Sequence, residues 1–575
     1  MNLFLDYQKK ILKSLKSLEK KKVINIPKIV RNLTVELPPK NQKADISCNV
    51  ALILAKINNT SPYELAKIIK KHLLINFKEF KDIEIAGPGF LNIFFQASFW
   101  PDYLKKIIKL DSKFGSNKIE KKRYNIEFVS ANPTGPLHVG HSRGAILGDA
   151  LSNLLTFNGN KVVKEYYVND YGNQIKNFVK SVYYRILEIK DNKEFPKDED
   201  LYPGNYIIEI AKKILKKNNI KDFKNFEKIY GKLLKESLKL SMNIIEQNLN
   251  LLGVKHNNFV YESDLIKNKE VDKIIRKLEK KNYIYKGQLE APKGEKTKDW
   301  KKRKQLLFKS TMFGDDIDRP LQKADGSWTY FAGDMAYHSN KISRKFNKLI
   351  NILGADHAGY TKRITSATNA ISDNKVKLVC KVSQLVKLYK NGEPFKMSKR
   401  KGDYITVEDL IKEVGKDPTR FMMLNRSSDV EIDFDFKKVT EKSKDNPIFY
   451  VQYAYARINS VFRLLKLDLE NLIKTDKKNN MMNQYEIEIL KKISEWPRCV
   501  EISSLKLEPH RIPFYLYELA TLFHSYWNLG KDNEEYRFIT DNKPTNYLRL
   551  TILQGIALVI KNGMTILGVA TPKSM

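Results

Sequence analysis

The sequence predicts a multidomain α/β protein, in which a Rossmann-like core follows an α+β N-terminal domain and precedes an all-α C-terminal domain. Residues 126–155 indicate the start of the core: an apolar β-branched run, a loop with proline and glycine, then a run of helical spacing. Two apolar runs around a Gly-Pro-Gly turn in residues 83–95 predict paired N-terminal strands, and amphipathic helical patterns fill residues 445–575.

The predicted domain boundaries follow changes in composition. A chain of 575 residues favours several domains, which we place at residues 1–110, 120–440 and 445–575, with a linker around 111–123. Lysine-rich helical patterns in residues 186–305 predict an insertion between two halves of the core sheet. Most of the positive charge in this insertion is typical of a solvated helix face.

Local patterns predict further elements on either side of this insertion. In the N-terminal domain we expect helices at residues 6–21, 45–56 and 62–72, the last with Ser61 as N-cap and Pro62 at its first position. After the insertion we expect the core sheet to resume at residues 305–310 and to continue in the apolar strand 349–353. Asn391 and Gly392 predict the turn of a later hairpin.

Two short motifs carry the chemistry. His138 and His141 flank Gly140 where the first core helix is predicted to begin, and the backbone N–H groups and dipole of a helix N-terminus favour phosphate. Histidines there can donate hydrogen bonds to phosphate oxygens. Much later, Lys396 and Lys399 lie in the sequence KMSK, where two lysines can bind one polyphosphate. Each motif alone is weak, because polar residues often begin helices and lysine pairs are usually solvated.

The order HVGH then KMSK resembles the paired signatures of class I aminoacyl-tRNA synthetases. Five segments are similar to arginyl-tRNA synthetases, namely SANPTGPLHVGH, EYYVNDYGNQI, DGSWTYFAGDMAYH, NPIFYVQYAYARI and the closing ILGVATPKSM. Arg400, where many class I enzymes carry a second serine, is a minor departure. The resemblance implies a class I catalytic core, an anticodon-binding C-terminal domain, and an ATP-dependent arginine–tRNA ligase that forms arginyl-adenylate and releases AMP and pyrophosphate.

The resemblance also implies roles for individual residues. The expected catalytic residues are His138, His141, Lys396 and Lys399. The expected ATP-binding residues are Pro136, His138, Gly140, His141, Gly354, Asp356, His357, Lys396, Met397, Ser398 and Lys399. The expected arginine-binding residues are Glu127, Ser130, Asn132, His141, Tyr330 and Asp334. The expected tRNA-binding residues are Asn92, on the exposed side of a strand, with Tyr453, Arg457 and Met575.

Several of these assignments also follow from side-chain chemistry. A guanidinium offers five N–H donors in a fork that suits carboxylates, so Asp334 and Glu127 are suitable partners for the side chain and ammonium of arginine. The sequence does not say which acid takes which group, and Asp334 as a helix N-cap remains an alternative. Arg457 and nearby aromatics can stack on bases, although such a stripe is more often core.

Composition bounds the cofactors and partners. The net charge of +37 favours a polyanion such as tRNA(Arg), unless lysine is a compositional habit of the source. Three widely separated cysteines support neither a zinc site nor disulfides. The chain has no apolar run of about 20 residues that would predict a membrane span. The N-terminal segment lacks an apolar signal core, so we expect a folded helix there, with an organellar transit peptide as the alternative. The resemblance implies L-arginine, tRNA(Arg) and ATP with Mg²⁺ as the substrates. We further expect a cytoplasmic monomer that holds no tight metal or organic cofactor and binds no membrane.

Three other functions remain open. A small-molecule nucleotidyltransferase also uses the HxGH motif, but the chain length and helical C-terminal region argue against it. The intact HVGH and KMSK motifs argue against a catalytically inactive RNA-binding paralogue. A class I synthetase of another amino-acid specificity is less consistent with the segment around Asp334.

Overall fold

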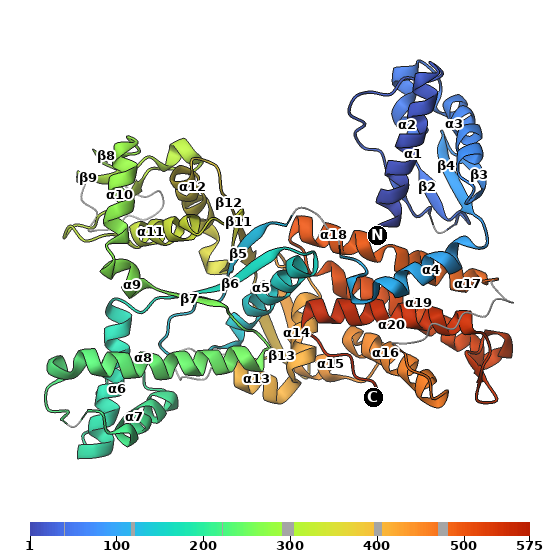
Figure 1. The fold of residues 1–575 in the computed structure, drawn as a ribbon. Coiled ribbons are helices and arrows are strands. Elements are labelled where there is room, and N and C mark those ends of the chain that lie inside the picture. Colours follow the sequence, from blue (N-terminus) through green and yellow to red (C-terminus); the bar gives the residue numbers. More distant parts are fainter. Residues whose placement is uncertain (40, 117–120, 221, 290–303, 396–404, 470–480) are drawn as a thin grey trace. The chain divides into compact units, whose positions relative to one another are not determined.

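The computed structural model describes all residues except 40, 117–120, 221, 290–303, 396–404 and 470–480 (Figure 1). The chain divides into two compact units. The first unit comprises residues 1–119, 442–566 and 570–575, and the second comprises residues 120–441 and 567–569.

A five-stranded parallel sheet in the order β12-β11-β5-β6-β7 forms the centre of the second unit (Figure 1). Its strands, in chain order, are β5 (Arg123–Glu127), β6 (Lys161–Val168), β7 (Asn258–Tyr261), β11 (Lys348–Gly354) and β12 (Lys377–Ser383). The chain passes from β5 outward to β7 and then returns to β11 on the other side of β5. The topological switch point therefore lies between β5 and β11, where open α/β sheets bind ligands beyond the carboxyl ends of their strands.

Helices cover both faces of this sheet. Helix α5 (Val139–Phe157) packs on one face, where a Cβ atom on Gly148 would lie 2.2 Å from the Phe128 ring, so this close approach requires glycine. The other face packs against a buried cluster that includes Leu349, Met335 and Ala367. Met335 belongs to α11 (Tyr330–Ser343) and Ala367 to α12 (Thr361–Ser372), which follows the short 3₁₀ helix η4 (Ala355–Tyr360).

Residues 186–305 do not form one continuous insertion into the core sheet. Strand β7 falls within residues 186–305 yet pairs in parallel with β6, so the core sheet extends into this region. Residues 305–310 do not resume the core sheet either, because β9 belongs to a separate antiparallel sheet, β10-β9-β8. The lysine-rich helical pattern gave no sign of β7, and at residues 305–310 sequence periodicity identifies a strand but not its partners.

The remaining elements of this region form two smaller bodies. Helices α6, α7 and α8 enclose a hydrophobic core of their own, while α9 and α10 lead to the small sheet (Figure 1). Their bounds are α6 (Asn173–Asp191), α7 (Asn205–Lys217), α8 (Phe226–Leu251), α9 (Glu262–Lys267), α10 (Glu270–Lys280), β8 (Ile284–Gly287), β9 (Gln305–Phe308), η3 (Ser310–Phe313) and β10 (Arg319–Pro320).

The end of the second unit contains the predicted hairpin. Asn391 (φ 55°) and Gly392 (φ 84°) both adopt positive φ in the turn that joins β13 to β14, as a two-residue hairpin turn requires. Strand β15 pairs with β13 in parallel, and short helices follow. The bounds are β13 (Val386–Lys390), β14 (Glu393–Pro394), α13 (Val407–Val414), α14 (Lys416–Leu424), β15 (Ile432–Asp435) and α15 (Phe436–Thr440).

The N-terminal part of the first unit is an antiparallel sheet, β1-β2-β4-β3, packed with helices. Its elements are α1 (Leu3–Lys20), β1 (Val35–Glu36), β2 (Ile46–Cys48), α2 (Val50–Ala55), η1 (Lys56–Asn58), α3 (Pro62–Asn76), β3 (Phe80–Ala86) and β4 (Phe90–Phe95). The Ser61 cap is confirmed, since its side chain accepts a hydrogen bond from Glu64 N. The helix predicted at residues 45–56 is wrong in its first half, because residues 46–48 pair with β4 as a strand.

The prediction of an exposed Asn92 is also wrong. Asn92 is only 4% exposed, and its Nδ2 donates to Gln42 Oε1 at 2.6 Å. In β4 the two neighbours of Asn92, Leu91 and Ile93, are buried too, so the strand is covered on both faces and does not alternate between core and solvent.

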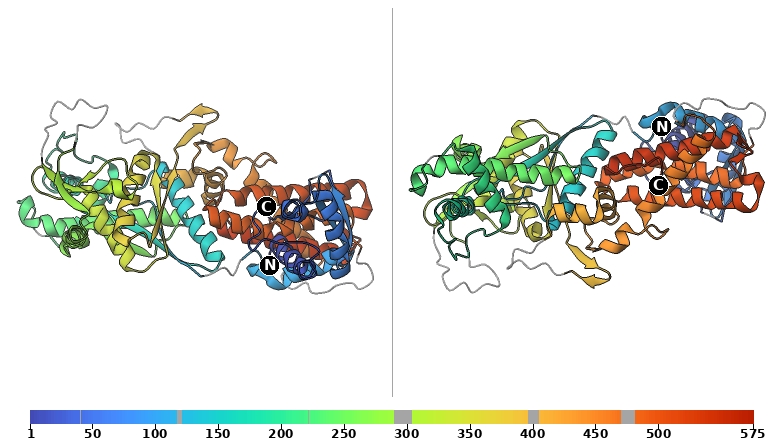
Figure 2. Two further views of the ribbon diagram at one scale, coloured as in Figure 1. Left: turned by 90° about the horizontal axis from the view of Figure 1, so that it is seen from above. Right: turned by 90° about the horizontal axis from the view of Figure 1, so that it is seen from below.

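The rest of the first unit is helical, and α16–α20 run side by side in several views (Figures 1 and 2). The bounds are α4 (Phe99–Leu110), η2 (Asp111–Lys113), α16 (Pro447–Leu464), α17 (Gln484–Ser494), α18 (Trp496–Lys506), α19 (Arg511–Asp532), η5 (Glu534–Tyr536), β16 (Ile539–Thr540), β17 (Lys543–Pro544) and α20 (Tyr547–Leu567). Among the described helices, α20 alone is long and apolar enough to span a membrane, but its most apolar window is 83% buried within the protein, as in a core helix.

Candidate active site

The HVGH segment begins α5 and forms its cap. His138 is the N-cap residue, and its Nδ1 accepts a hydrogen bond from Gly140 N at 3.1 Å. His141 closes the motif, because its Nδ1 accepts from His138 N at 3.2 Å. Gly140 is required here, since a Cβ atom at this position would lie 2.8 Å from the His138 ring. The prediction that both histidines lie at a helix N-terminus is confirmed.

These hydrogen bonds determine the chemistry of the two imidazoles. In both rings Nδ1 accepts a backbone N–H, so the neutral tautomer carries its proton on Nε2. Burial and the neighbouring His138 lower the pKa of His141 to about 4, although Asp356 acts in the opposite direction. At neutral pH His141 is therefore an uncharged Nε2–H donor at the positive end of a helix, an arrangement that suits a phosphate oxygen.

The flank of the second motif lies against the first. Lys396, Met397, Ser398 and Lys399 are outside the described residues, which resume at Ile405. Val139 N donates to Ile405 O at 3.0 Å and Val407 N donates to Leu137 O at 2.9 Å, so the chain after KMSK pairs with HVGH. The two motifs are far apart in the sequence, and these two hydrogen bonds bring the residues that follow KMSK next to HVGH.

The carboxyl end of β11 lies next to that of β5 in the sheet. Gly354 ends β11, and a Cβ atom there would lie 2.5 Å from Asp356 Oδ1. The Asp356 and His357 side chains are exposed and lie 3.5 Å apart. Asp356 also acts electrostatically on His141, which places these predicted ATP-binding residues on the same edge of the sheet as the histidines.

Strained backbone follows β5. Val129 (φ 71°) and Ser130 (φ 43°) both adopt left-handed conformations, which a β-branched residue rarely does and which cost about 1–3 kcal/mol each. The turn directs the Ser130 hydroxyl back to Glu127, where Oγ donates to Oε1 at 3.1 Å while accepting from Tyr167 N at 3.0 Å. The structure therefore brings the predicted pair Glu127 and Ser130 together.

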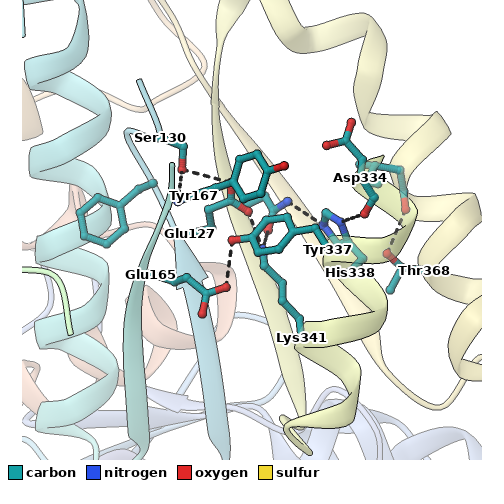
Figure 3. A network of polar contacts seen from close by, with 12 residues as sticks. Glu127, Ser130, Glu165, Tyr167, Asp334, Tyr337, His338, Lys341 and Thr368 are labelled. Atoms are coloured by element: carbon teal, nitrogen blue, oxygen red, sulfur yellow. Dashed lines mark hydrogen bonds and ion pairs between the residues drawn. The ribbon is translucent and has the colours of Figure 1, made fainter. Parts of the chain in front are cut away.

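A buried polar network lies beneath Glu127 (Figure 3). Lys341 Nζ donates to Glu127 Oε2 at 2.5 Å and to Asn351 Oδ1 at 3.0 Å. Asn351 is joined to His338 Nε2 at 3.0 Å. Burial and Lys341 lower the pKa of His338 to about 3, so this ring is neutral.

Glu165 lies beside Glu127 in the register of β5 and β6. Its carboxylate accepts hydrogen bonds from Tyr337 Oη at 2.9 Å and Asn258 Nδ2 at 2.7 Å, and it pairs with both terminal nitrogens of Arg344. Burial opposes ionisation of Glu165, but Arg344 and the nearby Lys341 outweigh it and lower the pKa to about 2. Glu165 is therefore a fully satisfied anion within the core.

Asp334 and Glu262 have the opposite environment. Burial raises the pKa of Glu262 to about 7, with help from Asp334 and Asp170. Burial also raises the pKa of Asp334 to about 6, helped by Glu127 and opposed by a hydrogen bond from Tyr360 Oη. Lys341 and Arg363 lower the pKa of Asp334 from a distance, but neither acid forms an ion pair with a described residue, so both carboxylates lie half-buried without a directly paired cation.

The start of α9 positions Glu262. Asp170, just after β6, accepts hydrogen bonds from Ser263 N at 2.8 Å and Ser263 Oγ at 2.6 Å. Asn169, with its amide nitrogen turned to Glu262, donates to Oε2 at 2.6 Å. The loop after β6 thus holds Glu262 in place near Asp334.

Comparisons with known proteins agree over the whole chain. The family model described as "tRNA synthetases class I (R), catalytic domain" matches residues 103–462, "Arginyl tRNA synthetase N terminal domain" matches 6–95, and "DALR anticodon binding domain" matches 451–575. The arginine–tRNA ligase of Pelagibacter ubique is 55% identical over 100% of both chains, and that of Brucella suis is 42% identical over the same share. The chain belongs to the arginyl-tRNA synthetases.

Solved structures agree with this membership. A structure assigned as an arginyl-tRNA synthetase from Campylobacter jejuni has a TM-score of 0.72 at 29% identity, over 84% of this chain and 100% of its own. The Thermus thermophilus arginyl-tRNA synthetase has a TM-score of 0.70 at 17% identity, over 99% of both chains, and supports the fold alone. As an arginyl-tRNA synthetase, the protein is an ATP-dependent class I ligase that joins arginine to tRNA.

The other residues predicted from the arginyl-tRNA synthetase resemblance are dispersed. Asn132 is exposed and its Nδ2 donates to Gln174 Oε1 at 2.6 Å. Tyr330 begins α11 and is 75% exposed, one turn before Asp334. The N-cap of α11 is Thr329, which excludes the alternative that Asp334 is the cap.

Two predicted tRNA-binding residues of this synthetase lie together on α16. The Arg457 guanidinium lies 4.1 Å from the centroid of the Tyr453 ring and 5.2 Å from that of Trp527, and Nη1 contacts His524 Nδ1 at 3.2 Å. Met575, the last residue, is exposed.

Sequence reasoning missed several polar residues that surround Glu127 and Asp334, namely Asp170, Glu262, Tyr360, His338, Lys341 and Asn351. Helical spacing was a usable signal for part of this set. Asp334, His338 and Lys341 recur at intervals of four and three on α11, which puts them on one face. Glu262 had no such signal, because β7 was not recognised as a strand of the core sheet.

Proposed function

We propose that the carboxyl edge of the core sheet, at the switch point, binds arginine with its guanidinium between Asp334 and Glu262 and its α-ammonium at Glu127 and Ser130. The observation that carries this assignment is the pair of acids with raised pKa and no ion pair among the described residues. A guanidinium supplies the missing positive charge and up to five N–H donors in a planar fork. Asn132 and Tyr330 complete the rim.

We propose that ATP binds beside this site, at the start of α5 and the end of β11. His138 and His141 face the α-phosphate through Nε2–H, with Pro136 and Gly140 shaping the loop. Gly354, Asp356 and His357 follow the adjacent strand, where a nucleoside can approach the backbone. Lys396 and Lys399, with Met397 and Ser398 between them, are assigned to the β and γ phosphates, and the pairing of Ile405–Val407 with HVGH supports this.

We propose that Mg²⁺ enters with ATP. The donors at the phosphate end are the ring Nε2–H groups of the two histidines, which suit phosphate oxygens and not a metal ion. Within the described ranges no group of three or more His, Cys, Asp or Glu residues is arranged as a metal site. The ion would therefore be held by phosphate oxygens and water.

The proposed chemistry needs no nucleophile from the protein. A carboxylate oxygen of arginine attacks the α-phosphorus, the bond to the bridging oxygen breaks, and pyrophosphate leaves. A ribose hydroxyl at the 3′ end of the tRNA then attacks the acyl carbonyl, loses its proton, and displaces AMP. The protein contributes orientation and stabilisation of the charge that develops on the α-phosphate. His138 and His141 are assigned to that charge, and the two lysines to the departing pyrophosphate.

The remaining partners follow from the same proposal. We propose tRNA(Arg) as the acceptor, with its anticodon contacting the helical domain near Tyr453, Arg457 and Met575, where an exposed methionine and a guanidinium stacked on aromatic rings offer contacts for bases. We further propose that the enzyme works as a monomer in the cytoplasm.

Exchange of pyrophosphate into ATP tests these assignments, with each amino acid supplied in turn and with or without total tRNA. We expect exchange with arginine only. His141→Ala should lower kcat by about 10²–10³-fold, because one preorganised donor to the transition state is lost. Lys399→Ala should lower exchange as well, whereas Lys387→Ala, at an exposed lysine on β13, should not.

Exchange with a different amino acid would overturn the arginine site. Undiminished exchange in His141→Ala and Lys399→Ala would overturn the phosphate assignments. Comparing the reactions with and without tRNA also measures whether activation requires the tRNA.

A further inference from the structure

Helix α11 turns polar side chains towards the core sheet. Lys341 is completely buried, and its ammonium lies 4.4 Å from the centroid of the Tyr337 ring (Figure 3). Taking an ammonium out of water is unfavourable unless it is paired and hydrogen-bonded. Its polar partners are Glu127 Oε2 at 2.5 Å and Asn351 Oδ1 at 3.0 Å, and Glu127 is the acid assigned to the substrate ammonium.

Both oxygens of Glu127 are engaged before any substrate arrives. Ser130 donates to Oε1 at 3.1 Å and Lys341 donates to Oε2, from opposite ends of the carboxylate. The two contacts fix the plane of the carboxylate, while each oxygen keeps a further lone pair for an incoming donor. The Glu127 side chain is 12% exposed, so it remains accessible at one edge.

Lys341 is itself held by a chain of hydrogen bonds whose direction is determined at every step. His338 Nδ1 lies 2.9 Å from the carbonyl oxygen of Asp334 and must donate to it, so Nε2 of the neutral ring accepts from Asn351 Nδ2. The Asn351 amide then turns its oxygen to Lys341. The chain connects the backbone at Asp334 to the carboxylate of Glu127 through groups that are all buried.

We propose that Lys341 is a positioning residue for arginine activation, which holds the Glu127 carboxylate in the orientation that receives the α-ammonium. This inference rests on the proposed assignment of Glu127 to that ammonium. Lys341 does not touch the substrate, because Glu127 lies between them. The Asn351–His338 pair in turn holds Lys341. A substitution at Asn351, which is assigned no contact with arginine, should therefore also weaken arginine binding.

The neighbouring pair of Glu165 and Arg344 offers a matched control. Glu165 is the register partner of Glu127, and Arg344 lies three residues after Lys341, at the C-cap of the same helix. This second pair has the same type of charges but is assigned no contact with arginine. Removing the Arg344 charge should therefore disturb the fold without changing arginine recognition.

The experiment compares KM for arginine, KM for ATP, kcat and melting temperature in Lys341→Met, Lys341→Arg, Asn351→Ala, Glu127→Gln and Arg344→Met. Lys341→Met should raise KM for arginine by at least about tenfold, since the Glu127 carboxylate loses the contact that fixes its orientation, while KM for ATP stays unchanged. Lys341→Arg should recover most of this loss. Asn351→Ala should raise KM for arginine by a smaller factor, and Arg344→Met should lower the melting temperature alone.

The outcomes separate this inference from the proposal beneath it. If Glu127→Gln leaves KM for arginine unchanged, the assignment of Glu127 is wrong. If Glu127→Gln raises KM but Lys341→Met and Asn351→Ala do not, Lys341 is structural and the inference is overturned. Should Lys341→Met fail to fold, Asn351→Ala and Lys341→Arg decide, because a purely structural role predicts lower melting temperatures with an unchanged KM.

Discussion

Two pairs of carboxylates near the carboxyl edge of the core sheet have opposite environments. Glu127 pairs with Lys341 of α11, and Glu165 pairs with Arg344, the C-cap of that helix. Asp334 and Glu262 have no ion pair with a described residue, and burial raises the pKa of both, with Asp334 adding to the effect at Glu262 and Glu127 adding to it at Asp334. The difference teaches how to distinguish roles in an acid-rich site: carboxylates that the chain neutralises are held in place, and those left without a cation await one from a ligand.

The two environments have opposite effects on the free energy of the ionised carboxylate. Interactions with Arg344 make ionised Glu165 favourable in the fold, which is why its pKa falls to about 2. Ionised Asp334 and Glu262 are unfavourable in the fold until a cation arrives. Binding of a guanidinium relieves that cost, and an analogue without one does not. Discrimination can therefore be steep, because the wrong ligand leaves buried acids unpaired.

The largest effect is expected at Asp334. In the proposed site, Asp334→Asn removes a charge assigned to the substrate guanidinium, so kcat/KM for arginine should fall by about 10³-fold in pyrophosphate exchange, while KM for ATP remains unchanged. A loss of less than about tenfold would remove the distinction between the two acid pairs.

The next effect should be on stability and not on activity. Glu165→Gln leaves Arg344 without its anion and should destabilise the fold by about 3 kcal/mol, measured by urea unfolding. KM for arginine at a temperature where the variant is folded should match the parent. A raised KM for arginine would mean that Glu165 belongs to the binding site after all.

A smaller effect should appear in the pH dependence of arginine binding. The pKa values of Asp334 and Glu262 are raised to about 6 and about 7 in the free protein, and a bound guanidinium favours their ionised forms and lowers both. Below pH 7 binding must release protons, so KM for arginine should rise as the pH falls, by roughly tenfold per unit between pH 7 and 6. It should be flat above pH 8.

The pH effect has a control in the chain itself. Glu262→Gln removes one of the two titrating acids and should make the dependence shallower. An identical slope in this variant would assign the titration to another group.

The smallest effect should be a gain in stability. Because the folded-state pKa of Glu262 is raised to about 7, its penalty is absent at low pH and fully present once the pH exceeds that value. Glu262→Gln should therefore raise the melting temperature at pH 8 by about 2 °C in the absence of arginine, and by less towards pH 5. A lower melting temperature at pH 8 would show that the Glu262 charge stabilises the fold.

Particular elements show why prediction succeeded in some places only. The strand, loop and helix around HVGH, the Ser61 cap and the Asn391-Gly392 turn were predicted because each depends on neighbouring residues. The placement of β7, the separate sheet that contains β9, and the burial of Asn92 were not predicted, since each depends on a strand partner distant in the sequence.

By itself the sequence determined the motifs, the chemistry that they can perform, and the likeness to arginyl-tRNA synthetases, because these depend on residue types at short spacings. The tertiary structure decided which acid has a partner. The sequence alone does not distinguish the four acidic side chains of Glu127, Glu165, Glu262 and Asp334. They differ because folding places Lys341 beside Glu127 and Arg344 beside Glu165. Electrostatic energy depends on distance and burial, and both are properties of the packed chain.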